Sequence, residues 1–178
     1  KNECFLPPGE DASCPYFWPI GNRYIFLFFS HTTGSQYLLG DYNKEEHCFY
    51  PTFHGRFNFM SFLPGGVHAP SATSDGKGGV IVIHNMHTGK KSPGWRGITT
   101  LPRKLTLDKC DTINIQPYGD YKSLRTHHQH IDKTHLPANK EIIIDNIQGN
   151  ALEIKAEINI KSSPMIEMNV LRSPDKEE

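Results

Sequence analysis

The sequence predicts an all-β protein whose first part is built from β-propeller blades. Helix signals are nearly absent, because no window shows apolar residues at sustained spacings of three and four. Two stretches, one beginning at Cys14 and the other at Ala69, repeat the same order of residue types 55 positions apart. A period of about 50 residues with several strands in each repeat is typical of propeller blades.

The first repeat contains four expected strands. A Pro-marked segment at 14–19 leads through the Gly21 turn into the continuous apolar run 24–30, which is short enough for a strand buried on both faces. Residues 36–42 follow the next turn, and residues 47–50 follow a charged turn. Four strands in succession make one blade.

The second repeat has the same order. Residues 69–72 form the expected short first strand, and the Gly-rich segment 74–79 forms a turn before the apolar run 80–85. The third strand is expected at 97–101 and the fourth at 103–107.

Beyond residue 107 the pattern changes. Residues 152–160 alternate apolar and polar side chains, as in a sheet with one face in water. Further strands are expected at 111–116, 141–145 and 165–171. The chain therefore divides into a propeller part (1–107), a linker (108–140) and the start of a β-sandwich (141–178).

Two blades cannot close a ring, and open terminal repeats leave sheet edges and apolar faces uncovered. We therefore expect this chain to be an internal or C-terminal piece of a larger protein. The remaining N-terminal blades of that protein would be its partners.

Composition excludes some classes of function. The 19 basic and 19 acidic side chains cancel, so no general field attracts nucleic acid or anionic membranes. No run of about 18 apolar residues predicts a transmembrane helix. The four cysteines lack a CxxC spacing, which disfavours a zinc knuckle, and we favour buried free thiols over two disulfides. We favour an extracellular or periplasmic location.

A histidine-rich segment raises the question of a metal site. His127, His128 and His130 lie close to His135, with Asp132 between them. The segment falls in the expected linker, whereas metal ligands usually stand on ordered elements at defined spacings. We predict no metal and no cofactor.

Three local patterns resemble glycoside hydrolase family 32, the invertases, inulinases and levanases. The segment 14–21 resembles the Glu-Cys-Pro segment of the family, and 68–72 resembles the strand that opens its fifth blade. Trp95, followed by Leu-Pro-Arg at 101–103, is similar to the segment that closes the propeller. Residues 123–125 then resemble the linker into the C-terminal sandwich of the family.

The resemblance implies the last two blades of a five-bladed β-propeller, followed by a β-sandwich. It also implies retaining hydrolysis of fructosyl bonds in sucrose or fructans, with an oligosaccharide or disaccharide as substrate. The family uses an Asp nucleophile and a Glu acid/base, and a retaining pair of carboxyl groups stands only about 5–5.5 Å apart. The nucleophile stretch and the Arg-Asp-Pro element of the family do not occur in this chain. We therefore expect the isolated chain to be inactive.

The acid/base position also departs from the family. Ser13 stands where the family has its Glu, and a serine hydroxyl cannot replace a carboxylic acid as a proton donor at neutral pH. Asp11, two residues earlier, points to the same side of an extended strand, whereas Glu10 points away. Asp11 is therefore the first candidate and Glu10 the second, and the alternative is that both acids cap a surface turn.

Four further residues are candidates for substrate binding: Ser13, Cys14, Tyr16 and His68. His68 heads a short inner strand, where an imidazole could bind a sugar hydroxyl, or it is a loop histidine without a role. Tyr16 could line a sugar site, although core packing is the more frequent role of such aromatic residues. The alternative function is a carbohydrate-binding propeller without catalysis, because Ser13 occupies the acid/base position.

Overall fold

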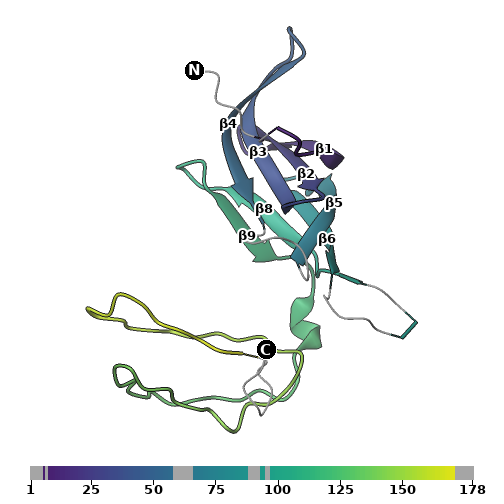
Figure 1. Cartoon of the computed structure of the whole chain (residues 1–178). Helices are drawn as coiled ribbons and strands as arrows, with labels where there is room; N and C mark the ends of the chain where they lie inside the picture. Colours follow the sequence, from purple (N-terminus) through teal and green to yellow (C-terminus); the bar gives the residue numbers. More distant parts are fainter. Residues whose placement is uncertain (1–5, 7, 58–65, 88–92, 95–96, 171–178) are drawn as a thin grey trace. The chain divides into compact units, whose positions relative to one another are not determined.

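The computed structural model describes residues 6, 8–57, 66–87, 93–94 and 97–170. Within these ranges the regular structure is β, apart from one short 3₁₀ helix, η1 (Tyr121–Leu124). The chain forms two compact units, Lys1–Tyr121 and Lys122–Glu178. The predicted all-β class is confirmed (Figure 1).

The first sheet is an antiparallel meander in the order β1-β2-β3-β4. Its four strands appear where the sequence predicts them, although each is longer than expected. The two-residue turn Gly21-Asn22 joins the first pair, and Gly21 takes a φ of +57°, which glycine adopts without steric cost. The strands are β1 (Ser13–Ile20), β2 (Arg23–Ser30), β3 (Gly34–Asn43) and β4 (Cys48–Arg56).

The second sheet has the order β5-β6-β8-β9, with β7 also paired to β6. Its strands are β5 (Gly66–Ser74), β6 (Val80–His87), β7 (Ile98–Thr99), β8 (Arg103–Leu107) and β9 (Ile113–Pro117).

One strand assignment in this sheet was wrong. We predicted residues 103–107 as the fourth strand, but β8 is the third neighbour in the sheet, and β9, inside the predicted linker, is the fourth. The reason is that β7 and β8 pair with successive parts of one strand, because Met86 faces Ile98 and Val80 faces Leu105. Pro102, which has no N–H to donate, lies in the break between them.

The two sheets pack face to face and share one hydrophobic core. Each fully buried aliphatic side chain in such a core stabilises the fold by about 1.5–3 kcal/mol. Two hydrogen bonds also join the sheets, from the Trp18 indole to the Ala72 carbonyl (3.2 Å) and from the Gly21 N–H to the Gly78 carbonyl (2.8 Å). The buried members of the core are Ile20, Ile25, Leu27, Leu39, Val80, Val82 and Leu105.

Asp75 organises the turn between β5 and β6. Its carboxylate lies 2.6 Å from the Lys104 ammonium and accepts hydrogen bonds from the backbone N–H groups of Lys77 (2.7 Å) and Gly79 (2.8 Å). These contacts, that with Lys104 first, lower the pKa of Asp75 to about 2. The turn is thus held by a carboxylate that stays charged in all but strong acid.

We expect Asp75→Asn to lower the melting temperature of the chain at neutral pH, because the amide cannot pair with Lys104. A lowered carboxyl pKa adds stability above its ordinary value of 3.8, and this stability is lost as the pH falls towards about 2. The variant should therefore lose less stability than the wild type between pH 4 and pH 2. Thermal unfolding followed by circular dichroism checks this, and equal acid sensitivity of both proteins would contradict it.

The second unit differs from the prediction. No strand occurs between residues 122 and 170, so the strands predicted at 141–145 and 152–160 are not formed. The strand predicted at 165–171 is likewise missing from its described part, residues 165–170. Apolar alternation defines a face, but a strand forms only when a neighbouring strand accepts its hydrogen bonds. Within this unit, Arg125 holds Glu153 through two hydrogen bonds of 2.6 and 2.5 Å.

The three cysteines that the structure describes are free, as predicted, but they are not buried. Cys14, Cys48 and Cys110 carry free thiols and are all exposed, because each lies in a bulge or beside a turn rather than in the core. Cys4 lies outside the described residues.

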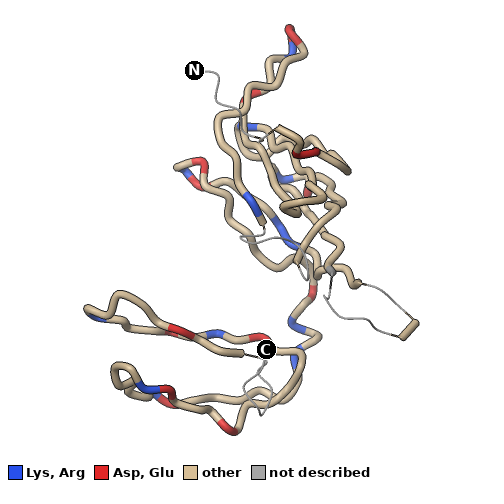
Figure 2. Tube along the Cα trace, viewed as in Figure 1, with Lys and Arg blue, Asp and Glu red and all other residues tan. Residues whose placement is uncertain are grey.

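Along the described part of the trace, positions of Lys and Arg and positions of Asp and Glu are interspersed (Figure 2). In the described part of the chain, no helix has the length and apolar character required to cross a bilayer.

Candidate functional site

The candidate site lies where β1 and β5 begin. Ser13 pairs with Phe29, and His68, 55 positions later, pairs with Asn85. A β-bulge follows each of them, because pairing resumes at Tyr16 in β1 and at Pro70 in β5 with one extra residue inserted. Bulges re-aim side chains and are frequent next to active sites. Ser13 and His68 therefore occupy equivalent places in the two sheets.

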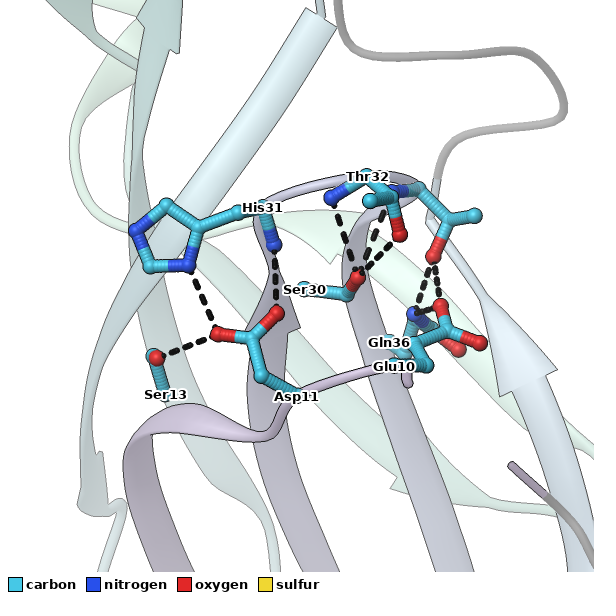
Figure 3. Close-up of polar contacts among 8 residues, drawn as sticks. Glu10, Asp11, Ser13, Ser30, His31, Thr32 and Gln36 are labelled. Carbon is cyan, nitrogen blue, oxygen red and sulfur yellow. Dashed lines mark hydrogen bonds and ion pairs between the residues drawn. The ribbon is translucent and has the colours of Figure 1, made fainter. Parts of the chain in front are cut away.

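Asp11 lies just before β1 and is held by three hydrogen bonds (Figure 3). Its Oδ1 accepts from the backbone N–H of His31 at 2.9 Å. Its Oδ2 accepts from the Ser13 hydroxyl at 2.7 Å and lies 2.6 Å from Nδ1 of His31. The contact with Ser13 places both side chains on the same side, as the strand spacing predicts. The hydrogen bond from the His31 backbone, followed by those from Ser13 and the His31 ring, strongly lowers the pKa of Asp11.

Glu10 points to a different set of partners. Its Oε1 accepts hydrogen bonds from the Thr33 hydroxyl and from Nε2 of Gln36, the latter at 2.9 Å. Burial raises the pKa of Glu10, but hydrogen bonds from Thr33, Gln36 and Ser30 outweigh it, so the net pKa is lowered. Gln36 is fully buried, and its Oε1 accepts from Nε2 of His54 at 2.6 Å. Glu10 therefore anchors the segment before β1 to the turn between β2 and β3.

These surroundings bear on proton transfer. A general acid must carry a proton at the working pH, and its efficiency is greatest when its pKa lies near that pH. The pKa values of Asp11 and Glu10 are both lowered, away from neutral pH. The two carboxylates are thus arranged to accept hydrogen bonds from their neighbours rather than to donate a proton.

Sequence reasoning missed His31. It follows directly after β2, and its imidazole is mostly exposed, with 68% of the side chain accessible. Its ring packs on Phe29 (centroids 4.6 Å apart), and Phe29 in turn contacts the ring of His68 (5.4 Å). The only available signal was a histidine at the end of an apolar run, because the contact with Asp11 spans 20 residues.

Two predicted binding residues lie elsewhere. Tyr16 is partly buried against the shared core, so it packs between the sheets. Cys14 is exposed within the bulge of β1, with a φ of +51°. Among the described residues it makes no side-chain contact with the network around Asp11.

Comparison with known proteins adds no relative. No protein-family model and no curated protein matches this chain. The site must therefore be interpreted from its own geometry and from the resemblance noted in the sequence.

The described residues contain no group of three or more His, Cys, Asp or Glu side chains that could hold a metal ion. In the histidine-rich segment, Nε2 of His130 lies 3.6 Å from Asp132, and both side chains are largely exposed. Trp95, which contributed to the resemblance, lies outside the described residues.

Proposed function

We propose that the unit Lys1–Tyr121 forms two neighbouring blades of a β-propeller and that the starts of their first strands form part of a carbohydrate site. The observation that carries this proposal is the way in which the two sheets repeat. The first sheet is a four-stranded meander, and the second follows the same path through β5, β6, β8 and β9, with β7 added beside β6. Both sheets have a bulge at the same place in the first strand.

The packing of the two sheets favours neighbouring propeller blades rather than a β-sandwich with two-fold symmetry. Equivalent residues of β1 and β5 are 55 positions apart, and those of β2 and β6 are 56 apart. The difference arises because the turn between β5 and β6 is one residue longer than the turn between β1 and β2. The first sheet uses Ile25 and Leu27 in the shared core, whereas the second uses Val80 and Val82. Val80 is equivalent to Tyr24, on the other face of its sheet. The contact is therefore head-to-tail, and such contacts generate rings when the rotation closes.

The repeat also indicates where a preceding blade would pack. The face of the first sheet opposite the core carries Phe17, stacked on Tyr24 with centroids 5.2 Å apart and contacting Tyr42 and Phe49 edge-on. The equivalent face of the second sheet is the one buried against the first. An N-terminal blade would cover this aromatic face in the same way.

Within this architecture, we propose that the protein containing this chain is a glycoside hydrolase acting on fructosyl bonds in sucrose or fructans. The family-like segments support the substrate class. The contacts of Asp11 with Ser13 and His31 near the start of β1 support the site, and Phe29 contacts the rings of both His31 and His68. The carboxylate nucleophile would come from another part of that protein, because its segment does not occur in these 178 residues.

A carbohydrate-binding propeller without catalysis is the second candidate. It is favoured by Ser13 in the acid/base position and by the lowered pKa values of the two nearby carboxyl groups. Such a protein would bind fructans without cleaving them.

Incubation of the full-length protein with sucrose, inulin and levan distinguishes the two functions. Hydrolysis would release fructose or glucose, measured by chromatography, whereas the second function predicts binding in calorimetry with no release. The 178-residue chain alone should release no sugar. If the protein neither binds nor cleaves any of the three sugars, both functions are contradicted.

The same assay tests the two carboxylates. We expect Asp11→Asn to reduce turnover through its contact with His31. Glu10→Gln, which keeps an acceptor for Thr33 and Gln36, should have the smaller effect. Unchanged turnover in both variants would mean that neither carboxylate contributes to the reaction.

A further inference from the structure

The Asp11–His31 pair has the geometry of a positioned proton-transfer group. Asp11 contacts the imidazole at Nδ1 and the backbone N–H of the same residue, so it fixes both the ring and the chain that carries it. A carboxylate at Nδ1 leaves Nε2 as the nitrogen that gains and loses the proton. In the described part of the chain, Nε2 of His31 makes no hydrogen bond, and the side chain is mostly exposed.

The surroundings hold the ring in one place. Phe29 supports one side of the imidazole, with centroids 4.6 Å apart, and also contacts His68 from the second sheet. Ser13 donates to Asp11, which stabilises the ionised carboxylate that His31 needs as a partner. Glu10, one residue before Asp11, is engaged by Thr33 in the turn after β2 and by Gln36 in β3.

We infer that His31, held by Asp11, is the proton-transfer residue of this site and takes over the role of the carboxylic acid that Ser13 cannot fill. This inference rests on the glycosidase function proposed above. It names the residue that acts on the leaving group, while Asp11 is a positioning residue.

The step balances as follows. The Nε2–H of protonated His31 gives its proton to the glycosidic oxygen, while the bond between that oxygen and the anomeric carbon breaks and the leaving sugar departs as an alcohol. A carboxylate elsewhere in the protein forms the new bond to the anomeric carbon. In the second half, water attacks that carbon, the bond to the carboxylate breaks, and the proton from water returns to Nε2 of His31.

The first test is spectroscopic and uses the 178-residue chain. Nitrogen-15 NMR of the neutral imidazole reports which ring nitrogen carries the proton. We expect the proton of His31 on Nδ1 in the wild type, and a shift towards the tautomer mixture of a free imidazole in Asp11→Ala. Identical spectra for His31 in both proteins would overturn the pair.

The second test separates a catalytic from a structural role in the full-length protein. Loss of a general acid slows hydrolysis by about 10²–10⁴-fold. We expect His31→Gln to show this loss with sucrose, but little loss with a fructosyl fluoride, whose leaving group needs no proton. His47→Asn is the matched control, because His47 lies in the turn between β3 and β4, at the other end of β3 from His31, with a φ of +52° that asparagine tolerates.

Each outcome has one meaning. Equal loss on both substrates, or no loss on either, would overturn the role of His31 while leaving the glycosidase function standing. A wild-type protein that cleaves neither substrate would overturn the proposed function, and the catalytic role of His31 with it.

Discussion

Leu27→Ala should lower the free energy of unfolding of the first unit by about 2–5 kcal/mol. Leu27 is fully buried at the centre of the core that both sheets share. Removing its three terminal carbons loses their burial and leaves a cavity between two sheets that cannot easily close. Because domains are stable by only about 5–15 kcal/mol, urea unfolding should detect the change readily.

The same experiment tests whether the two sheets unfold together. Val82→Ala shortens a buried side chain of the second sheet, and it should lower the urea midpoint of the same single unfolding transition. Ile115→Ala, on β9, is the control, because this side chain is 47% exposed and its loss should cost well below 1 kcal/mol. Two separate transitions, each moved by only one of the core variants, would show that the sheets do not share a core.

His84→Leu should remove a large part of the acid sensitivity of the fold. The imidazole of His84 is fully buried, and among the described residues neither ring nitrogen has a hydrogen-bond partner. Burial, followed by the positive charges of Arg103 and His68, lowers the pKa of His84 from 6.5 to about 4. Between pH 6.5 and pH 4, His84 is therefore largely neutral in the folded protein but protonated in the unfolded chain.

The direction of the pH effect follows from this difference. Stability is full above pH 6.5 and falls as the pH drops from 6.5 to 4, because the unfolded state then binds more protons. The loss amounts to roughly 3 kcal/mol, since one pKa unit corresponds to 1.36 kcal/mol. Unfolding free energies measured at pH 7 and pH 4.5 should fall further in the wild type than in His84→Leu. An equal fall in both proteins would contradict the prediction.

Local patterns predicted the strands of the first unit well. The apolar run at 24–30 and the Gly-marked turns carry their own signals, because residue type determines both turn geometry and burial. The fourth strand of the second sheet was misplaced because Pro102 separates two short strands that pair with successive parts of β6. In the sequence these two pieces were counted as the third and fourth strands. In the second unit, alternation was present without a pairing partner, so no strand formed.

The candidate site was predicted only in part. Strand spacing placed Asp11 beside Ser13, because residues two apart share a side of an extended chain. His31 could not be found in this way. Its contact with Asp11 depends on the antiparallel pairing of Ser13 with Phe29, and pairing partners are not marked in the sequence.

The presence of two similar β-sheets in the first unit, with glycine-marked turns at equivalent places, could be predicted from the sequence alone, since repetition and residue type are local properties. The tertiary structure was needed to show that the two sheets of the first unit pack head-to-tail, with Ile25 and Leu27 of the first sheet in one core with Val80 and Val82, which lie on the non-equivalent face of the second. It also decided that an acid before the first strand meets a histidine after the second. Both outcomes depend on which surfaces come together when apolar area is removed from water, and this is a property of the whole fold.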